Sequence, residues 1–144
     1  MMIMKTIKYL VIGALMLGFN APAVAQDNKA TIEQVSKLIK SNGSADAIKD
    51  IFKANKKNPE VLLGMGRAYL EVKDTANATK YANLALARDK KYAKAYILLG
   101  DIAVVQDDGG KAAEWYQQAK YFDPKDPEGY FKYANILRGR SPEE

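Results

Sequence analysis

The sequence has 144 residues, which is enough for one domain. It contains no cysteine and no histidine, so disulfides, thiolate zinc sites, cysteine nucleophiles and a lipid-anchored cysteine are excluded, and the commonest general base and transition-metal ligand is missing. The net charge of +5, from 22 basic and 17 acidic residues, is mild and gives little support to nucleic-acid binding.

The first 25 residues have the pattern of a secretory signal peptide. Lys5 and Lys8 precede an apolar run over residues 9–19, and Ala-Val-Ala follows at residues 23–25. An uncleaved membrane anchor is the alternative, but 11 apolar residues fall short of the roughly 20 that span a bilayer. We therefore expect cleavage after Ala25 and a periplasmic or secreted mature protein with no stable membrane span.

Residues 26–58 are expected to form a polar lead-in and a degenerate first helical hairpin. Residues 27–29 are polar, and we expect them to be loose. A helix is predicted from Thr31, ended by Ser-Asn-Gly at residues 41–43, and Ser44 is predicted to cap a second helix. The expected apolar stripes are Ile32, Val35, Leu38 and Ile39 in the first helix, and Ala47, Ile48, Ile51 and Phe52 in the second.

From residue 59 to residue 126 the chain repeats one 34-residue pattern twice. The positions Leu62, Met65, Gly66, Tyr69, Ala78 and Ala85 recur as Tyr96, Leu99, Gly100, Ala103, Ala112 and Ala119, and a third copy begins with Tyr130, Tyr133, Ala134 and Leu137. An internal period of this length is typical of repeat proteins, in which each unit stacks on its neighbours.

The first part of each copy predicts an amphipathic helix, which we call helix A. Leu62, Met65, Gly66 and Tyr69 have the spacing of a single helical face. Glycine inside a helix costs about 1 kcal/mol relative to alanine. We therefore expect Gly66 and Gly100 to lie where another helix passes too closely for a side chain.

The second part of each copy predicts a helix B with a smooth face. In the first copy, Asp74 or Thr75 can cap this helix, and a stripe of small residues follows. In the second copy, residues 106–110 form the predicted turn. The expected buried stripes are Ala78, Ala82 and Ala85 in the first copy, and Ala112, Tyr116 and Ala119 in the second.

This pattern resembles the tetratricopeptide repeat, W-x2-L-G-x2-Y, then A-x3-F, then P. The second copy reads Tyr96-x2-Leu99-Gly100-x2-Ala103, Ala112-x3-Tyr116 and Pro124. The resemblance implies an all-α fold of antiparallel helical hairpins stacked as a right-handed solenoid. It places one repeat at residues 59–92, a second at 93–126, and the start of a further, truncated repeat at 127–144.

Proteins with this repeat bind peptides or partner helices on a concave surface lined by A helices, so the resemblance implies a non-catalytic scaffold with a protein or peptide partner. One subset grips terminal carboxylates with a lysine and an asparagine, where this chain has Leu63 and Arg67. The clamp is therefore not matched. The family's groove positions correspond to Glu60, Leu63, Arg67, Leu70, Lys94, Ile97, Asp101, Val104, Glu128, Phe131, Asn135 and Arg138.

The third copy predicts an exposed end, because its helix A has no following helix B within this sequence. Tyr130, Tyr133 and Leu137 would then form an apolar strip, which is a surface for interaction or self-association. We expect a longer repeat protein, or a second chain that covers the strip. The alternatives to a groove-binding scaffold are a structural assembly unit of an envelope complex and the non-catalytic part of a longer enzyme. No cofactor or metal is expected.

Overall fold

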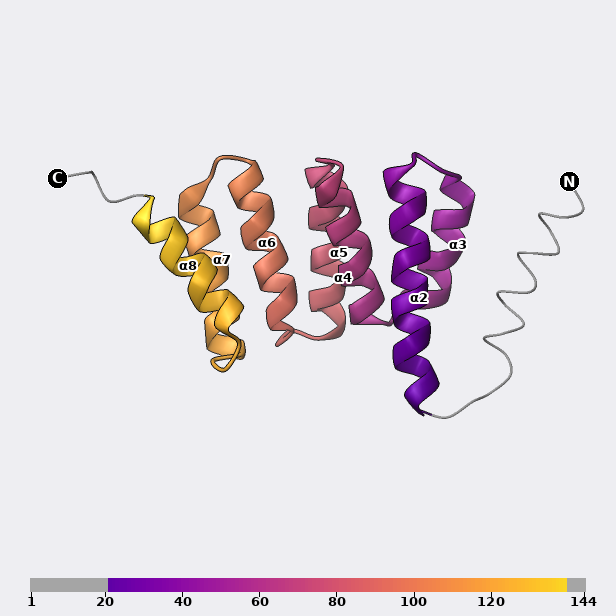
Figure 1. The fold of residues 1–144 in the computed structure, drawn as a ribbon, viewed down its shortest axis with the longest axis horizontal. Helices are drawn as coiled ribbons and strands as arrows, with labels where there is room; N and C mark the ends of the chain where they lie inside the picture. The colour runs from indigo at the N-terminus through magenta and orange to yellow at the C-terminus, as the bar shows by residue number, and fades with distance from the viewer. Residues whose placement is uncertain (1–20, 140–144) are drawn as a thin grey trace, which may run out of the picture.

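The computed structural model describes residues 21–139 of the chain, and their side chains from residue 27 onward. This part contains helices and no strand, which confirms the all-α prediction (Figure 1). The predicted signal peptide lies mostly in residues 1–20, outside the described residues. The helices are α2 (Ala21–Lys40), α3 (Ala45–Asn55), α4 (Pro59–Glu71), α5 (Thr75–Arg88), α6 (Ala93–Val105), α7 (Gly109–Phe122) and α8 (Pro127–Arg138).

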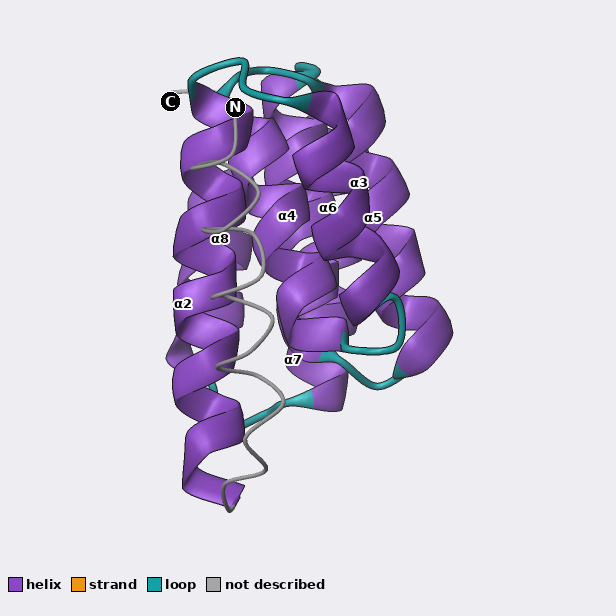
Figure 2. Cartoon of the chain, turned by 90° about the vertical axis from the view of Figure 1, so that its right-hand side faces the viewer, coloured by secondary structure: helices purple, strands orange, loops and turns teal. Residues whose placement is uncertain are grey.

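The helices form hairpins that lie side by side in a row (Figure 1). The pairs α2–α3, α4–α5 and α6–α7 are the hairpins, and α8 packs against α7 at the end of the row. Within the stack, α4 contacts both α2 and α6, so the A helices are neighbours of one another. Seen along the row, α2 and α8 lie on one side of the stack, and α3 and α5 lie on the other (Figure 2).

The same turn closes all three hairpins. Its key residue, Asn42, Lys73 or Asp107, has a positive φ of 52°, 63° or 58°. In each turn the next amide donates to a carbonyl five residues back, which is the helix-ending pattern known as the Schellman motif. The three hydrogen bonds are Gly43 N to Leu38 O at 2.7 Å, Asp74 N to Tyr69 O at 2.9 Å, and Asp108 N to Ala103 O at 2.8 Å.

The helix that follows each turn has a side-chain N-cap. The hydroxyl of Ser44 accepts from the amide of Ala47 at 3.2 Å, as the sequence predicts. Asp74 accepts from the amide of Asn77 at 3.0 Å, and Asp108 caps α7 in the same way. Such caps satisfy amides that the first helical turn leaves free and stabilise a helix by about 1 kcal/mol each.

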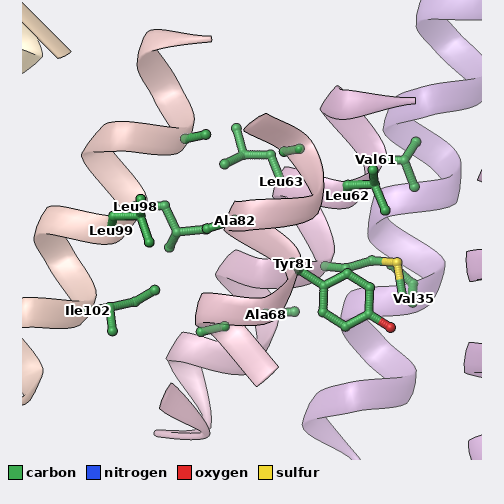
Figure 3. Packing of buried hydrophobic residues seen from close by; sticks show 14 of the residues in the cluster. Val35, Val61, Leu62, Leu63, Ala68, Tyr81, Ala82, Leu98, Leu99 and Ile102 are labelled. Atoms are coloured by element: carbon green, nitrogen blue, oxygen red, sulfur yellow. The ribbon is translucent and has the colours of Figure 1, made fainter. Parts of the chain in front are cut away.

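One apolar core runs from α2 across the second hairpin to α6 (Figure 3). Leu62 and Met65 of α4 lie at its centre, with Val35 of α2 on one side and Leu98 of α6 on the other. The predicted stripes of α5 and α7 are buried, including Ala82 in α5 and Ala112 in α7. Burying a large aliphatic side chain contributes about 1.5–3 kcal/mol, so this core is the main source of stability.

Gly66 and Gly100, which occupy the same position in the two copies of the repeat, lie where neighbouring helices approach closely, as predicted. A Cβ atom on Gly66 would come within 2.8 Å of Leu98 Cδ2, and one on Gly100 would come within 2.3 Å of Tyr116 Cε1. Ala134 takes the same repeat position in α8 and is exposed. A side chain is therefore tolerated there, because no described helix packs over α8 at that point.

The N-terminal hairpin differs from the prediction in two respects. Residues 27–29 are helical rather than loose, because α2 begins at Ala21. Asn28 is held by hydrogen bonds to Glu60 Oε2 at 2.8 Å and from Asn58 Nδ2 at 2.7 Å, and these contacts fasten α2 to the start of α4. The predicted stripe of α3 is only half-buried, since α3 is the outer helix at this end of the row.

Candidate functional site

A groove with a volume of about 540 Å³ lies on the face formed by the A helices α4, α6 and α8. The turn after α4 adds one residue, Lys73. We call this feature the groove and define it by its lining residues, which are Arg67, Leu70, Glu71, Lys73, Lys94, Leu98, Asp101, Val104, Val105 and Glu128. It lies on the face that the repeat pattern indicates.

The floor of the groove is apolar and its walls are charged. Val104 and Val105 are 46% and 40% exposed, although both belong to a helix that is otherwise well buried. Leu70 is half-buried beside them, and Leu98 reaches the groove from the core. An accessible apolar floor with charged groups around it is suited to an amphipathic peptide segment.

Six of the twelve predicted groove positions lie together in this groove, namely Arg67, Leu70, Lys94, Asp101, Val104 and Glu128. Phe131 and Asn135 are exposed on α8 but do not line it.

The predicted placement of Leu63 and Ile97 in the groove is wrong. Leu63 is 4% exposed and Ile97 is 1% exposed, so neither offers a surface to a ligand. Leu63 packs in the core around α4, and Ile97 packs in a second cluster with Tyr116 of α7. Their burial follows from the stacking of hairpins, which covers this flank of each A helix.

Sequence reasoning missed Glu71, Lys73, Leu98 and Val105 as lining residues. Two of them could have been predicted from the sequence. Glu71 and Val105 directly follow the predicted groove residues Leu70 and Val104, and they are separated by one repeat period of 34 residues. Lys73 had no such signal, since it belongs to a turn. Leu98 has the pattern of a core residue, and at 1% exposure it is one, although it borders the groove.

Two sets of polar contacts join α6 to α8 across the groove. Lys94 Nζ lies 3.0 Å from both Asp126 Oδ2 and Glu128 Oε2. Asp101 Oδ1 accepts from the Tyr116 hydroxyl and from Lys132 Nζ, each at 2.7 Å. These contacts hold α8 beside α6, and each carboxylate among them has a cationic partner, although Asp126 and Glu128 share the one on Lys94.

The same contacts shift three pKa values. Hydrogen bonds to Asp126 and Glu128 raise the pKa of Lys94 above its ordinary 10.5. The amide of Glu128 and the ammonium of Lys94 lower the pKa of Asp126 below its ordinary 3.8. Burial, together with the hydrogen bond to Asp101, raises the pKa of Tyr116 well above its ordinary 10.0.

Replacing Asp126 with asparagine is expected to reduce the acid sensitivity of folding. The lowered pKa of Asp126 means that its ionised form stabilises the fold above pH 3.8, and that this contribution is lost as the pH falls through the lower folded value. Asparagine keeps the N-cap acceptor for the amide of Glu128 but loses the ion pair with Lys94. Urea denaturation between about pH 2 and about pH 6 measures the difference.

Asp46→Asn is the matched control, because Asp46 is an exposed acid in the first turn of α3. Its stability should follow the pH curve of the native protein. The proposed role of the Asp126–Lys94 pair fails if Asp126→Asn shows the same pH dependence as Asp46→Asn.

The predicted end surface on α8 is partly covered. Tyr130 and Leu137 are exposed, as the sequence predicts, whereas Tyr133 is half-buried against α7. Lys120 of α7 lies over both rings, 4.7 Å from the centre of Tyr130 and 4.2 Å from that of Tyr133. These cation–π contacts attach α8 to α7 and leave an apolar strip facing outward.

The described residues contain no group of three or more acidic side chains placed to hold a metal ion. Within residues 21–139, none of the helices is both long enough and apolar enough to cross a bilayer.

Several solved structures have a similar arrangement of helices, and two of the three described below are tetratricopeptide-repeat (TPR) domains. The first such domain of Spaghetti (RPAP3), bound to the HSP90 peptide SRMEEVD, has a TM-score of 0.63 and 23% identity, and the match covers 79% of this chain and 93% of that one. The Arabidopsis OM64 domain has a TM-score of 0.62 and 19% identity, covering 78% and 96%. MamA has a TM-score of 0.59 and 22% identity, covering 78% and 63%.

No protein-family model and no curated protein sequence matches this chain. Structural likeness at these identities establishes the fold, and it agrees with the 34-residue period, the glycines at the helix crossings and the repeated turn. The described chain therefore has an all-α solenoid fold of the tetratricopeptide-repeat type.

Proposed function

We propose that this protein is a non-catalytic scaffold that binds a peptide or a segment of a partner protein in the groove. The observation that carries the proposal is the accessible apolar floor formed by Leu70, Val104 and Val105 between charged walls on α4, α6 and α8. A structural neighbour, the Spaghetti (RPAP3) domain, is bound to a peptide. The groove offers side-chain contacts alone, because the backbone groups of its helices are paired within those helices.

The double substitution Val104→Gln with Val105→Gln is expected to weaken peptide binding by at least about tenfold, since it removes the exposed apolar floor. Val104 is 46% exposed and Val105 is 40% exposed, so the double substitution should leave the fold intact. The measurement is isothermal titration or fluorescence anisotropy with a peptide selected on the native protein from a displayed random library.

Val72→Gln is the matched control for this test. Val72 is 42% exposed and ends α4, but it does not line the groove. Its binding constant should equal that of the native protein. The groove is excluded as the binding site if the double variant binds as tightly as the control.

The exposed strip on α8 supports a second candidate function, the assembly of several copies or of a larger complex. Leu137→Lys is expected to lower the molar mass of any assembly that forms with rising concentration, because it places a charge in the strip. Light scattering over a concentration series measures this, with the similarly exposed Val72→Lys as control. A mass that stays monomeric at every concentration contradicts self-assembly.

We further propose that the protein is exported and acts in the periplasm or outside the cell. The signal-peptide pattern supports this, with a cut after Ala25 that would also remove the first residues of α2. N-terminal sequencing of the protein from its own cells tests the proposal. A chain that begins at Gln26 supports export, and one that begins at Met1 in the cytosolic fraction overturns it.

A further inference from the structure

We propose that the groove selects acidic peptides, and that Arg67 and Lys73 bind their side-chain carboxylates while an apolar peptide residue occupies the floor. The inference rests on the proposed function of the groove and adds the chemical class of its ligand. It is carried by the pairing of the charged side chains that line the groove.

Each acidic residue of the groove already has a cationic partner within the protein. Glu71 forms an ion pair with Lys40 of α2. Asp101 pairs with Lys132 at 2.7 Å and also accepts from the Tyr116 hydroxyl. Glu128 pairs with Lys94 at 3.0 Å. Glu71 and Asp101 are therefore each matched by one cation, whereas Glu128 shares the single cation of Lys94 with Asp126, and ion-paired carboxylates offer less attraction to a basic ligand than free ones.

The cations of the groove are not matched in the same way. Lys94 is shared between Asp126 and Glu128. Arg67 and Lys73 are both exposed, and neither forms an ion pair with any residue in the described part of the chain. Two positive charges, those of Arg67 and Lys73, therefore remain without a partner in the groove, whereas the one negative charge in excess lies in the cluster that Asp126 and Glu128 form with Lys94.

The positions of these two cations suit a bound acidic segment. Arg67 is three residues before Leu70 in α4, so its guanidinium lies on the same helical face as one residue of the floor. The planar guanidinium can bind a carboxylate through two parallel hydrogen bonds. Lys73 directly follows the C-cap residue of α4 and also lines the groove.

The backbone conformation of Lys73 allows its positive charge to be removed without strain in the turn. With a φ of 63°, Lys73 has the left-handed conformation that costs most residues about 1–2 kcal/mol and costs glycine almost nothing. Lys73→Gly therefore removes the cation without weakening the turn. A loss of binding in this variant cannot be attributed to unfolding.

The experiment selects peptides from a displayed library of random dodecapeptides on the native protein, on the double variant Arg67→Gln with Lys73→Gly, and on the control Lys90→Gln with Lys91→Gln. The control removes the same charge from two exposed lysines outside the groove. The peptides are amidated at the C-terminus, so that only their side chains carry carboxylates. Binding constants are then measured for the peptides that the native protein enriches.

We expect the native protein and the control to enrich peptides rich in Glu and Asp. The double variant should lose this enrichment and bind the selected peptides about 3- to 20-fold more weakly, the range for two exposed ion pairs. Peptides with no acidic excess, or unchanged binding by the double variant, would overturn the charge selection. If the double substitution Val104→Gln with Val105→Gln still weakens the binding of those peptides, the proposed function stands without the charge selection. If no peptide is enriched, or binding ignores Val104 and Val105, the proposed function itself fails.

Discussion

Replacing Gly100 with alanine is expected to lower the free energy of unfolding by about 2–4 kcal/mol, through overpacking and the strain it puts on a partly buried hydrogen bond. The new Cβ would lie 2.3 Å from Cε1 and 2.5 Å from Cδ1 of Tyr116. That ring cannot move aside cheaply, because it is buried and its hydroxyl donates to Asp101 at 2.7 Å. Urea denaturation, followed by circular dichroism, measures the loss.

Gly139→Ala is the matched control for this substitution. A Cβ on Gly139 would meet no atom closer than 3.7 Å, and the residue has a negative φ of −69°. Its stability should equal or slightly exceed that of the native protein. The close approach of α7 to α6 is refuted as the reason for Gly100 if the two variants are equally stable.

Leu98→Ala is expected to cost about 2–5 kcal/mol, the range for a buried leucine whose cavity does not collapse. Leu98 is fully buried, and its Cδ2 atom fills the space that the missing side chain of Gly66 leaves. In Figure 3 it points from α6 toward Ala82 of α5, so it joins the second hairpin to the third. The substitution should therefore weaken the coupling between hairpins as well as their total stability.

The tryptophan provides a local probe of this effect. Trp115 is the only tryptophan in the sequence and belongs to α7, so its fluorescence reports the third hairpin while circular dichroism reports all helices. In Leu98→Ala the two urea transitions should separate, whereas in the exposed control Val72→Ala they should coincide. A loss below about 1 kcal/mol with coincident transitions would contradict the proposed role of Leu98.

The sequence predicts the helical hairpins well, because the residues that specify them act on neighbours within the same helix or the same repeat. The position of Gly66 and Gly100, the small-residue stripe that contains Ala82, and the cap at Ser44 each follow from helix geometry and from the 34-residue period. The start of α2 did not follow, because Asn28 is ordered by Glu60 and by Asn58, which lie 32 and 30 residues away. Such contacts carry no periodic signal.

The groove is predicted only in part, for a related reason. The repeat pattern identifies the outward positions of each A helix, and thereby Arg67, Lys94 and Asp101. It does not show which charges are paired, because that depends on where α8 lies relative to α6. Nor does it show that Leu63 and Ile97 are covered, since this depends on how tightly neighbouring hairpins pack.

The way α8 is attached gives the groove one adjustable wall. Among its residues only Gly129 is fully buried, Tyr133 and Ile136 are partly buried against the apolar cluster of α6 and α7, and its other links to the stack are polar or cation–π contacts made by Lys94, Lys132 and Lys120. The walls on α4 and α6, by contrast, are continuous with the apolar core. An element with few buried apolar contacts opens at lower free energy than the core. If the groove binds a peptide as proposed, we therefore expect α8 to move more readily than α4 and α6 when ligands of different width bind.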